Sequence, residues 1–377
     1  MKTIKRAAVL VLSCALLLTA VACHQPNETV LTIGDVQIPS GLYLAMQMDS
    51  FSTFTSTVQS SLSSGETMST ISDVLKHSAE DKTSDQWIKD KTLEAAKLYA
   101  AVMTLWNEFG LSLTEEEEAN LADWVDYYWS EDYQNMGSYY EPNGVSKETF
   151  AELMRNGTRQ NKVFLYYYDK PDAEGKGGLE TVPDADVIQG FSDNMVLVDN
   201  ISIATTKTDS SGNSTSLTDD EKTAAKDKLQ AYADRINNGK ASFEDIYVEY
   251  NKELKEDFTA PEVTDKMSQK YPRATVYSSA DSSTANYDQF KALKEKENFA
   301  YGKAYVVEGT SAYYLAVLRD ITTDEFYTGQ DTYRQSVLSM LKNEEFETKL
   351  KEKGDSLTLN KNEGLIRYYS PNKITNG

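Results

Sequence analysis

The N-terminal apolar segment constrains the fold most, because it separates a leader from the body of the chain. Lys2 and Arg6 belong to a positively charged start, and residues 7–22 are almost uninterruptedly apolar and end in small side chains. This is the pattern of a secretory signal peptide, and the run is too short for a lasting transmembrane helix. Both cysteines, Cys14 and Cys23, lie in or at the edge of this segment. We therefore expect the body to fold without disulfides, thiolate metal ligands or a cysteine nucleophile.

The end of the segment resembles the bacterial lipobox. Residues 20–22 are Ala-Val-Ala, with alanine where leucine is usual, and Cys23 follows them. The resemblance implies that residues 1–22 are removed and that Cys23 carries lipid, palmitate included. Residues 23–29 are then a polar tether. The protein would lie at the extracytoplasmic face of a bacterial cell membrane, anchored through the lipid on Cys23.

Two other schemes of N-terminal processing stay open. Cleavage near Ala22 would give a plain secreted protein in which Cys23 has no special role. Cys14 is a rival lipidation site, but cleavage there would leave a very short apolar region.

The charge and histidine counts exclude several classes of protein. The 377 residues carry 38 basic and 59 acidic side chains, a net charge of −21, and removing residues 1–22 with three of the bases leaves −24. No nucleic-acid partner is expected, because a phosphate-tracking surface needs clustered lysine and arginine. His24 and His77 are the two histidines of the chain, which excludes most histidine-based catalysis. Neither a metal site nor a cofactor is predicted.

Residues 30–195 have the periodicity of a helical domain with one small hairpin. Residues 30–38 contain two β-branched runs around Gly34 and predict the hairpin, and Ser40 opens a helix. Residues 52–85 are rich in serine and threonine and predict a loop with a partial helix. Three further helices are predicted: residues 85–109, a helix after the capping box Thr114–Glu117 that buries Leu121, Trp124, Val125 and Tyr128, and a helix from Ser146 toward Phe164.

Residues 196–320 have the pattern of a compact α+β domain. The predicted elements are a strand within 194–205, a helix opened by the capping box Thr218–Glu221, a short helix capped by Ser242, an irregular stretch over 251–286, a helix over 287–296, and strands over 304–307 and 313–318. A last helix follows at about 331–353. Because its apolar face needs cover, we expect residues 331–350 to pack on the helices of the first 165 residues.

The order of these motifs resembles the parvulin-type foldase lipoproteins and periplasmic chaperones, the PrsA and SurA group. Four segments carry the resemblance: the opening hairpin, the helix at 182–195, the helix junction at 236–246 and the helix at 334–350. The implied fold class is α+β, a mainly helical chaperone domain with an inserted parvulin-like domain. The implied divisions are a signal peptide (1–22), a tether (23–29), a helical domain (30–195), a parvulin-like domain (196–320) and a C-terminal helix that packs on the helical domain (321–365).

The two histidines typical of the parvulin family are not matched in this chain. Asn200 stands where the first strand of the family carries histidine, and Tyr314 stands where the last strand carries it. Residues 251–286 offer no convincing counterpart of the family's acidic or cysteine position. The resemblance therefore implies a degenerate isomerase site at Asn200 and Tyr314, and no catalytic residue is predicted. Alternatively, the two side chains keep a hydrogen-bonding pair in a working cleft.

Aromatic and methionine side chains in the helical part are candidates for binding unfolded chains. We single out Met46, Tyr127, Tyr128, Trp129 and Tyr167. Tyrosine and tryptophan offer large amphipathic contact area at modest entropic cost, and methionine adapts its shape. The alternative interpretation is that these side chains close the helical core and its rim.

Taken together, the sequence favours a membrane-anchored extracytoplasmic foldase or chaperone that binds unfolded, exported polypeptides, with a weak or inactive parvulin-like domain. Two alternatives stay open. One is an active peptidyl-prolyl cis-trans isomerase, and the other is a non-enzymatic adaptor lipoprotein of the cell envelope with one specific partner. A homodimer is also left open.

Overall fold

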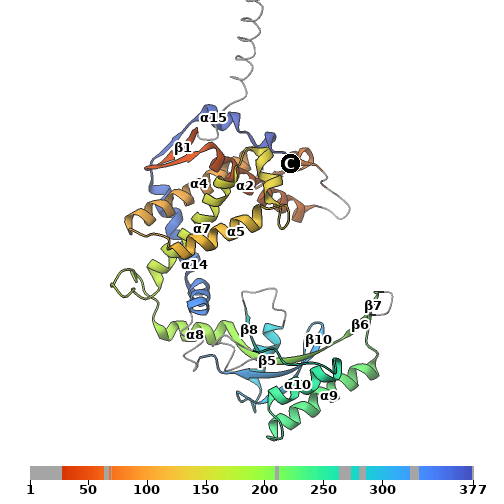
Figure 1. Ribbon diagram of the computed structural model, residues 1–377. Coiled ribbons are helices and arrows are strands. Elements are labelled where there is room, and N and C mark those ends of the chain that lie inside the picture. Colours follow the sequence, from red (N-terminus) through yellow and green to blue (C-terminus); the bar gives the residue numbers. More distant parts are fainter. Residues whose placement is uncertain are drawn as a thin grey trace, which may run out of the picture. The chain divides into compact units, whose positions relative to one another are not determined.

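The computed structural model describes residues 28–62, 68, 70–208, 212–262, 273–279, 286–322 and 331–375. The chain divides into two compact units: unit 1 comprises Met1–Tyr167 and Glu344–Gly377, and unit 2 comprises Tyr168–Asn343. Helices dominate and the sheets are small (Figure 1), which confirms the predicted α+β class. None of the described helices is both long and apolar enough to cross a bilayer. The predicted signal peptide and Cys23 lie outside the described residues.

Unit 1 contains a three-stranded antiparallel sheet in the order β11-β1-β2. Its strands are β1 (Thr29–Ile33), β2 (Val36–Pro39) and β11 (Leu359–Lys361). Gly34 adopts a φ of +57° in the turn between β1 and β2, a conformation that favours glycine. The hairpin predicted over residues 30–38 is confirmed. Strand β11 was not predicted, because its short polar run has no strand periodicity of its own.

Helix α2 (Ser40–Ser61) continues into residues 52–85, the stretch predicted as a loop with a partial helix. Serine and threonine hydroxyls in its second half donate to carbonyls three or four residues earlier, as Thr55 does to Phe51 at 2.9 Å. Phe54 and Val58 are buried at the same time. The hydroxyls are thus satisfied locally while the apolar side chains face the core, and residues 52–61 are a helical part of the predicted loop with a partial helix.

The remaining elements of unit 1 surround α2. They are α3 (Ile71–Val74), β3 (Ser78–Ala79), β4 (Lys82–Thr83), α4 (Ser84–Glu108), α5 (Glu115–Trp129), α6 (Met136–Tyr140), η1 (Glu141–Asn143), α7 (Lys147–Tyr168, in unit 1 up to Tyr167), α15 (Glu363–Tyr368) and η3 (Pro371–Lys373). The capping box predicted for α5 is confirmed: Thr114 Oγ1 accepts from the backbone N–H of Glu117 at 3.1 Å, and the Glu117 carboxylate accepts from that of Thr114 at 2.7 Å.

Helix α14 (Asp331–Ser356) contributes to both units. From Glu344 onward it belongs to unit 1, where the ring of Phe346 lies 5.3 Å from that of Phe164. Lys353 Nζ forms an ion pair with Glu108 at 2.7 Å. Residues 331–343 belong to unit 2. Residues 331–350 were all expected to pack on the helices of the first 165 residues. The division of the chain into units differs from this, because residues 331–343 make their contacts within unit 2.

Unit 2 contains a four-stranded antiparallel sheet in the order β8-β5-β10-β9. Its elements are α8 (Asp184–Asn194), β5 (Met195–Ala204), β6 (Thr206–Thr208), β7 (Ser214–Ser216), α9 (Asp219–Asn237), α10 (Phe243–Leu254), β8 (Ala274–Ser278), α12 (Tyr287–Lys291), η2 (Ala292–Glu295), β9 (Ala304–Glu308) and β10 (Ala312–Arg319). The expectation that residues 251–286 are irregular was wrong for β8. This short strand forms because it pairs with β5 at the edge of the sheet, a tertiary contact.

The two faces of this sheet are covered by different helices. Ile201, Tyr313 and Leu315 pack in one core cluster with residues of α9 and α10. Val196, Val198 and Ala316 pack in another with residues of α12 and η2. Helix α8, expected in the helical domain, belongs to unit 2 because it contacts β5 and because its Gly190 lies against Val337 of α14. The predicted boundary at 195/196 therefore does not coincide with the division at 167/168.

Two glycines in helices of unit 1 should respond oppositely to substitution by alanine. A Cβ at Gly354 of α14 would lie 2.7 Å from the Lys97 carbonyl oxygen of α4, whereas nothing lies within 4 Å of a Cβ at Gly157 of α7. We expect Gly354→Ala to lower the free energy of unfolding by about 1–3 kcal/mol through overpacking. Gly157→Ala should raise it by about 0.5–1 kcal/mol through helix propensity. Urea unfolding followed by tryptophan fluorescence measures both free energies. If the two substitutions change the free energy of unfolding in the same direction, the packing of α14 on α4 is contradicted.

Candidate functional site

The two candidate positions in unit 2 lie near each other on one face of the sheet. In the register of β5 and β10, Asn200 pairs with Ala316 and Tyr314 pairs with Ser202. Directly paired residues of antiparallel strands point to the same face, and residues two apart on a strand share that face. Asn200 and Tyr314 are therefore diagonal neighbours on the face covered by α12.

Both polar side chains are already occupied by hydrogen bonds within unit 2. Asn200 Nδ2 donates to Tyr277 Oη at 3.0 Å, and Asn286 Nδ2 donates to Tyr314 Oη at 3.1 Å. Asn286 Oδ1 accepts in turn from the backbone N–H of Thr310 at 2.9 Å. Burial raises the pKa of Tyr277, and the hydrogen bond from Asn200 opposes this shift.

An aromatic side chain fills the space beside these groups. Phe290 is fully buried, and its ring centroid lies 4.8 Å from that of Tyr277 and 5.4 Å from that of Tyr314. Gly309 approaches so closely that a Cβ there would lie 2.3 Å from Asn286 Oδ1 and 2.5 Å from the Tyr314 ring. The side chains of this face are therefore tightly packed around Asn200 and Tyr314.

The chemistry available at this face is hydrogen bonding rather than proton transfer near neutral pH. Asparagine does not titrate, and tyrosine ordinarily titrates near pH 10. His77 is the one histidine among the described residues, and it belongs to unit 1. Within the described ranges, no group of three or more His, Cys, Asp or Glu side chains could hold a metal ion.

A buried ion pair lies next to Asn200 on the strand. Asp199 is 2 % exposed, and its carboxylate lies 2.6 Å from Arg319 Nη2 of β10. Burial raises the pKa of Asp199, and the charge of Arg319 opposes that increase. Because successive strand residues face opposite sides of the sheet, this pair lies on the face away from Asn200.

Unit 1 presents an exposed aromatic surface on and beside α5, which we call the α5 aromatic surface. It consists of Trp124, Tyr127, Tyr128 and Tyr133, which are 54 %, 37 %, 36 % and 66 % exposed. The ring centroids of neighbouring members lie 5.0–5.9 Å apart. The prediction that Trp124 and Tyr128 are buried was wrong, because the core-facing side of α5 is narrow and buries only Leu121 and Val125.

The other predicted client-binding residues lie elsewhere in unit 1. Met46 is 4 % exposed and belongs to the core between the sheet, α2 and α4, so it is not available at the surface. Trp129 stacks on Tyr140 with centroids 6.3 Å apart and is a partly buried member of a second core cluster. Tyr167 is half-buried and packs edge-on against Phe109 at 5.5 Å. Of the five residues, Tyr127 and Tyr128 lie on the exposed surface.

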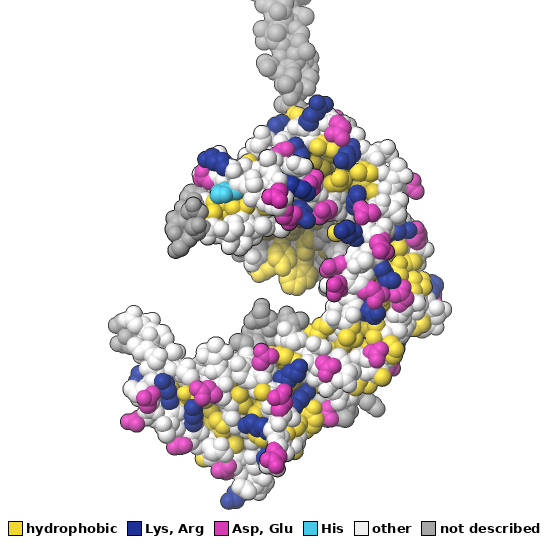
Figure 2. All heavy atoms as spheres, turned by 180° about the vertical axis from the view of Figure 1, so that it is seen from behind, with side chains coloured by type: hydrophobic (Ala, Val, Ile, Leu, Met, Phe, Trp, Pro, Cys, Tyr) yellow, Lys and Arg dark blue, Asp and Glu magenta, His cyan; other side chains and the backbone are white. Residues whose placement is uncertain are grey.

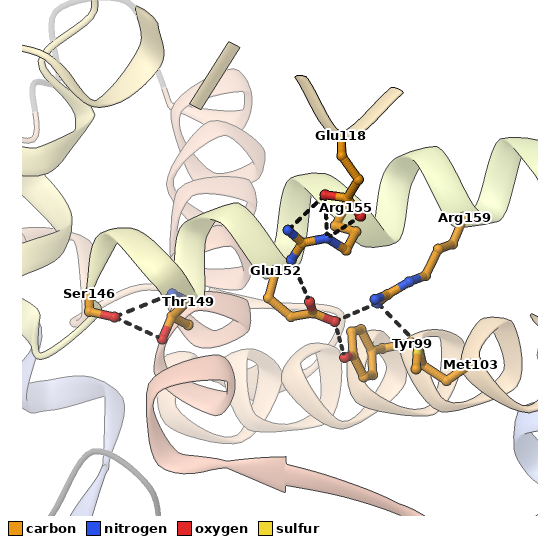
Figure 3. Close-up of polar contacts among 8 residues, drawn as sticks. All are labelled: Tyr99, Met103, Glu118, Ser146, Thr149, Glu152, Arg155 and Arg159. Atoms are coloured by element: carbon orange, nitrogen blue, oxygen red, sulfur yellow. Dashed lines mark hydrogen bonds and ion pairs between the residues drawn. The ribbon is translucent and has the colours of Figure 1, made fainter. Parts of the chain in front are cut away.

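A network of polar side chains connects α5 to the helices beneath it (Figure 3). The Glu152 carboxylate on α7 accepts from Tyr99 Oη of α4 at 2.7 Å and from Arg155 Nη1 at 3.0 Å, and it also accepts from Arg159. Arg155 Nη2 continues to the Glu118 carboxylate of α5 at 3.1 Å. Burial alone would raise the pKa of Glu152, but the hydrogen bonds from Arg159 and Tyr99 outweigh it and lower that pKa.

Comparisons with known proteins find similarity only at the level of solved structures. No protein-family model matches the chain, and no curated protein matches it. Three similar structures share 13 %, 11 % and 13 % sequence identity: foldase protein PrsA from Lactococcus lactis, PrsA from Bacillus subtilis and PrsA from Streptococcus pneumoniae. This chain resembles PrsA foldases.

The extent of the likeness differs among the three structures. The alignments cover 91 %, 71 % and 74 % of this chain and 100 %, 84 % and 92 % of the respective structures. Their TM-scores are 0.37, 0.32 and 0.35. TM-scores this low carry no functional argument, so the proposal below depends on the residues of this chain.

The Asp199–Arg319 pair should give unit 2 a characteristic pH dependence. Replacing Arg319 by methionine leaves a buried carboxylate unpaired, and we expect a loss of about 3 kcal/mol in the free energy of unfolding near pH 7.5. Because the folded-state pKa of Asp199 is raised, its ionised form opposes folding, and the cost grows as pH rises above the unfolded-state pKa. The deficit of Arg319→Met should therefore shrink as pH falls toward about 5.

The matched control is the exposed pair Arg235–Glu249, whose side chains are 39 % and 41 % exposed. Arg235→Met should cost under about 1 kcal/mol. Urea titrations of both variants at several pH values make the comparison. A deficit of Arg319→Met that is independent of pH would contradict the role assigned to Asp199.

Proposed function

We propose that this protein is a lipid-anchored extracytoplasmic chaperone that holds unfolded, exported polypeptides on the α5 aromatic surface. The observation that carries the proposal is the exposure of Trp124, Tyr127, Tyr128 and Tyr133 as one contiguous group. Soluble proteins keep large apolar groups apart on their surfaces unless they bind something there. Aromatic rings with polar tips contact many different apolar sequences with little loss of entropy.

The polar contacts beneath α5 support this role. Lys162 Nζ binds the Glu117 carboxylate at 2.7 Å, and Arg155 binds Glu118. These ion pairs come from α7 and lie on the side of α5 that faces unit 1. The rings can therefore stay exposed without the helix depending on them for its position.

Unit 2 is, in this proposal, a parvulin-like domain that contributes little or no catalysis. Isomerisation about an X–Pro bond crosses a barrier of about 18–20 kcal/mol, so a catalyst must favour the twisted amide over both planar states. Asn200 and Tyr314 are engaged with Tyr277 and Asn286, and Phe290 fills the space beside them. This packing favours a domain that keeps its fold without a working cleft.

The remaining parts of the proposal come from the sequence. Lipidation at Cys23 would anchor the protein to the cell membrane at its extracytoplasmic face, with residues 23–29 as the tether. A surface that serves one specific envelope partner is the alternative, and the range of clients distinguishes the two.

The aromatic surface should be required for suppressing aggregation. We expect the purified mature protein to delay aggregation of several unrelated unfolded clients, followed by light scattering. The double substitution Trp124→Ser and Tyr128→Ser should raise the protein concentration needed for the same delay about fivefold. The reason is that each ring contributes about 0.5–1.5 kcal/mol to binding. Tyr301→Ser, at a 41 % exposed tyrosine of unit 2, is the matched control and should change little. Protection of a single client only would favour the adaptor alternative.

The isomerase activity should be weak or absent. We expect the protein to accelerate the isomerisation of a short proline peptide less than about twofold over the uncatalysed reaction, which takes tens to hundreds of seconds. Asn200→Ala and Tyr314→Phe should leave the rate unchanged, because neither group acts on the amide. A strong acceleration that either substitution abolishes would establish the active-isomerase alternative.

A further inference from the structure

The chain around the α5 aromatic surface has an unusual charge pattern. Residues 98–146 contain ten carboxylates and no lysine, arginine or histidine. The ten are Glu108, Glu115, Glu116, Glu117, Glu118, Asp123, Asp126, Glu131, Asp132 and Glu141. The aromatic rings therefore lie within a strongly acidic stretch, whereas acidic and basic side chains alternate over the face of the molecule seen in Figure 2.

A pocket opens beside the rings in this stretch, and we call it the α5 pocket. It has a volume of about 530 Å³. Its lining residues are Asp123, Asp126, Tyr127, Trp129, Ser130, Tyr133 and Lys147. The rings of Tyr127 and Tyr133 lie 5.0 Å apart. Two aspartates and two tyrosines thus line the same pocket.

Not all of this negative charge is balanced by unit 1. Lys147 Nζ lies 2.6 Å from Asp126 and neutralises that carboxylate. Within the described residues, Asp123, Glu131 and Asp132 form no ion pair, and their side chains are exposed. The pocket and its rim therefore keep a net negative charge that can attract a cation from outside.

From this we infer that the α5 pocket binds an arginine or lysine side chain of an unfolded client, while the neighbouring rings contact the apolar residues beside it. The inference rests on the proposed function and specifies the class of polypeptide that the surface selects. A cation over a tyrosine ring is attracted by the ring quadrupole, and a nearby carboxylate adds to the attraction. Arginine suits the site better than lysine, because its planar guanidinium stacks on a ring and pairs with a carboxylate at once.

The test uses three unstructured, fluorescently labelled peptides that differ at two positions next to phenylalanine. The positions carry arginine, lysine or glutamine, and fluorescence anisotropy measures binding to the purified protein. At low ionic strength we expect the arginine peptide to bind about fivefold more tightly than the glutamine peptide, with lysine between them. The difference should fall below about twofold at 0.5 M salt, because screening weakens exposed charge pairs.

Substitutions in the pocket separate charge from apolar contact. Asp123→Asn should weaken binding of the arginine peptide about two- to threefold and leave the glutamine peptide unchanged. Tyr133→Leu keeps apolar area but removes the ring face, and it should also weaken only the cationic peptides. Asp227→Asn, at an exposed aspartate of α9, is the matched control and should change neither. Circular dichroism checks that the variants stay folded.

The outcomes distinguish this inference from the proposed function. Equal binding of the arginine and glutamine peptides at low salt, or equal behaviour of Asp123→Asn and Asp227→Asn, overturns the selectivity while the chaperone proposal stands. If the parent protein binds none of the peptides, both fail. If Trp124→Ser with Tyr128→Ser abolishes binding of all three peptides and Asp123→Asn affects only the cationic ones, both are supported.

Discussion

The carboxylate of Glu152 is the polar contact that joins α7 to α4 and, through Arg155, to α5. It is half-buried and accepts hydrogen bonds from Tyr99 of α4 and from two arginines of its own helix. One of these arginines, Arg155, also binds Glu118 of α5. A single anion thus links three helices. Breaking the network would leave polar groups unpaired at low dielectric, which costs more than an exposed ion pair contributes.

This arrangement explains how α5 can present aromatic rings to solvent. The helix buries only Leu121 and Val125, too little apolar area to fix its orientation by packing alone. Its ion pairs to α7 involve Glu117, Glu118 and Asp126, and each such pair near the surface contributes about 0–1 kcal/mol. These ion pairs contribute more to the orientation of α5 than to its stability, because together they fix which side of α5 faces unit 1. The rings of Trp124 and Tyr128 then lie on the free side.

Features that local chemistry determines could be predicted from the sequence, whereas features that depend on tertiary contacts could not. The capping boxes at Thr114 and Thr218 could be predicted because the spacing of threonine and glutamate is the structural motif itself, and both are confirmed. The exposure of Trp124 could not, because a spacing of three residues from Leu121 fits a buried face until the neighbouring helices are known. The nearness of Asn200 and Tyr314 follows from strand register, whereas the contact of Asn200 with Tyr277 depends on the tertiary pairing of edge strand β8 with β5.

An exposed aromatic surface carries a risk of self-association, and the charge of the surrounding chain bears on that risk. Two copies that met through their α5 aromatic surfaces would also bring together the carboxylates of Asp123, Glu131 and Asp132, which form no ion pair within the described residues. Like charges at close range oppose such an encounter, and the effect is strongest at low salt. An unfolded polypeptide that carries arginine or lysine meets the opposite field. The same carboxylates can therefore keep the rings accessible in solution and favour the clients that the rings are proposed to hold, so that solubility and selectivity arise from one distribution of charge.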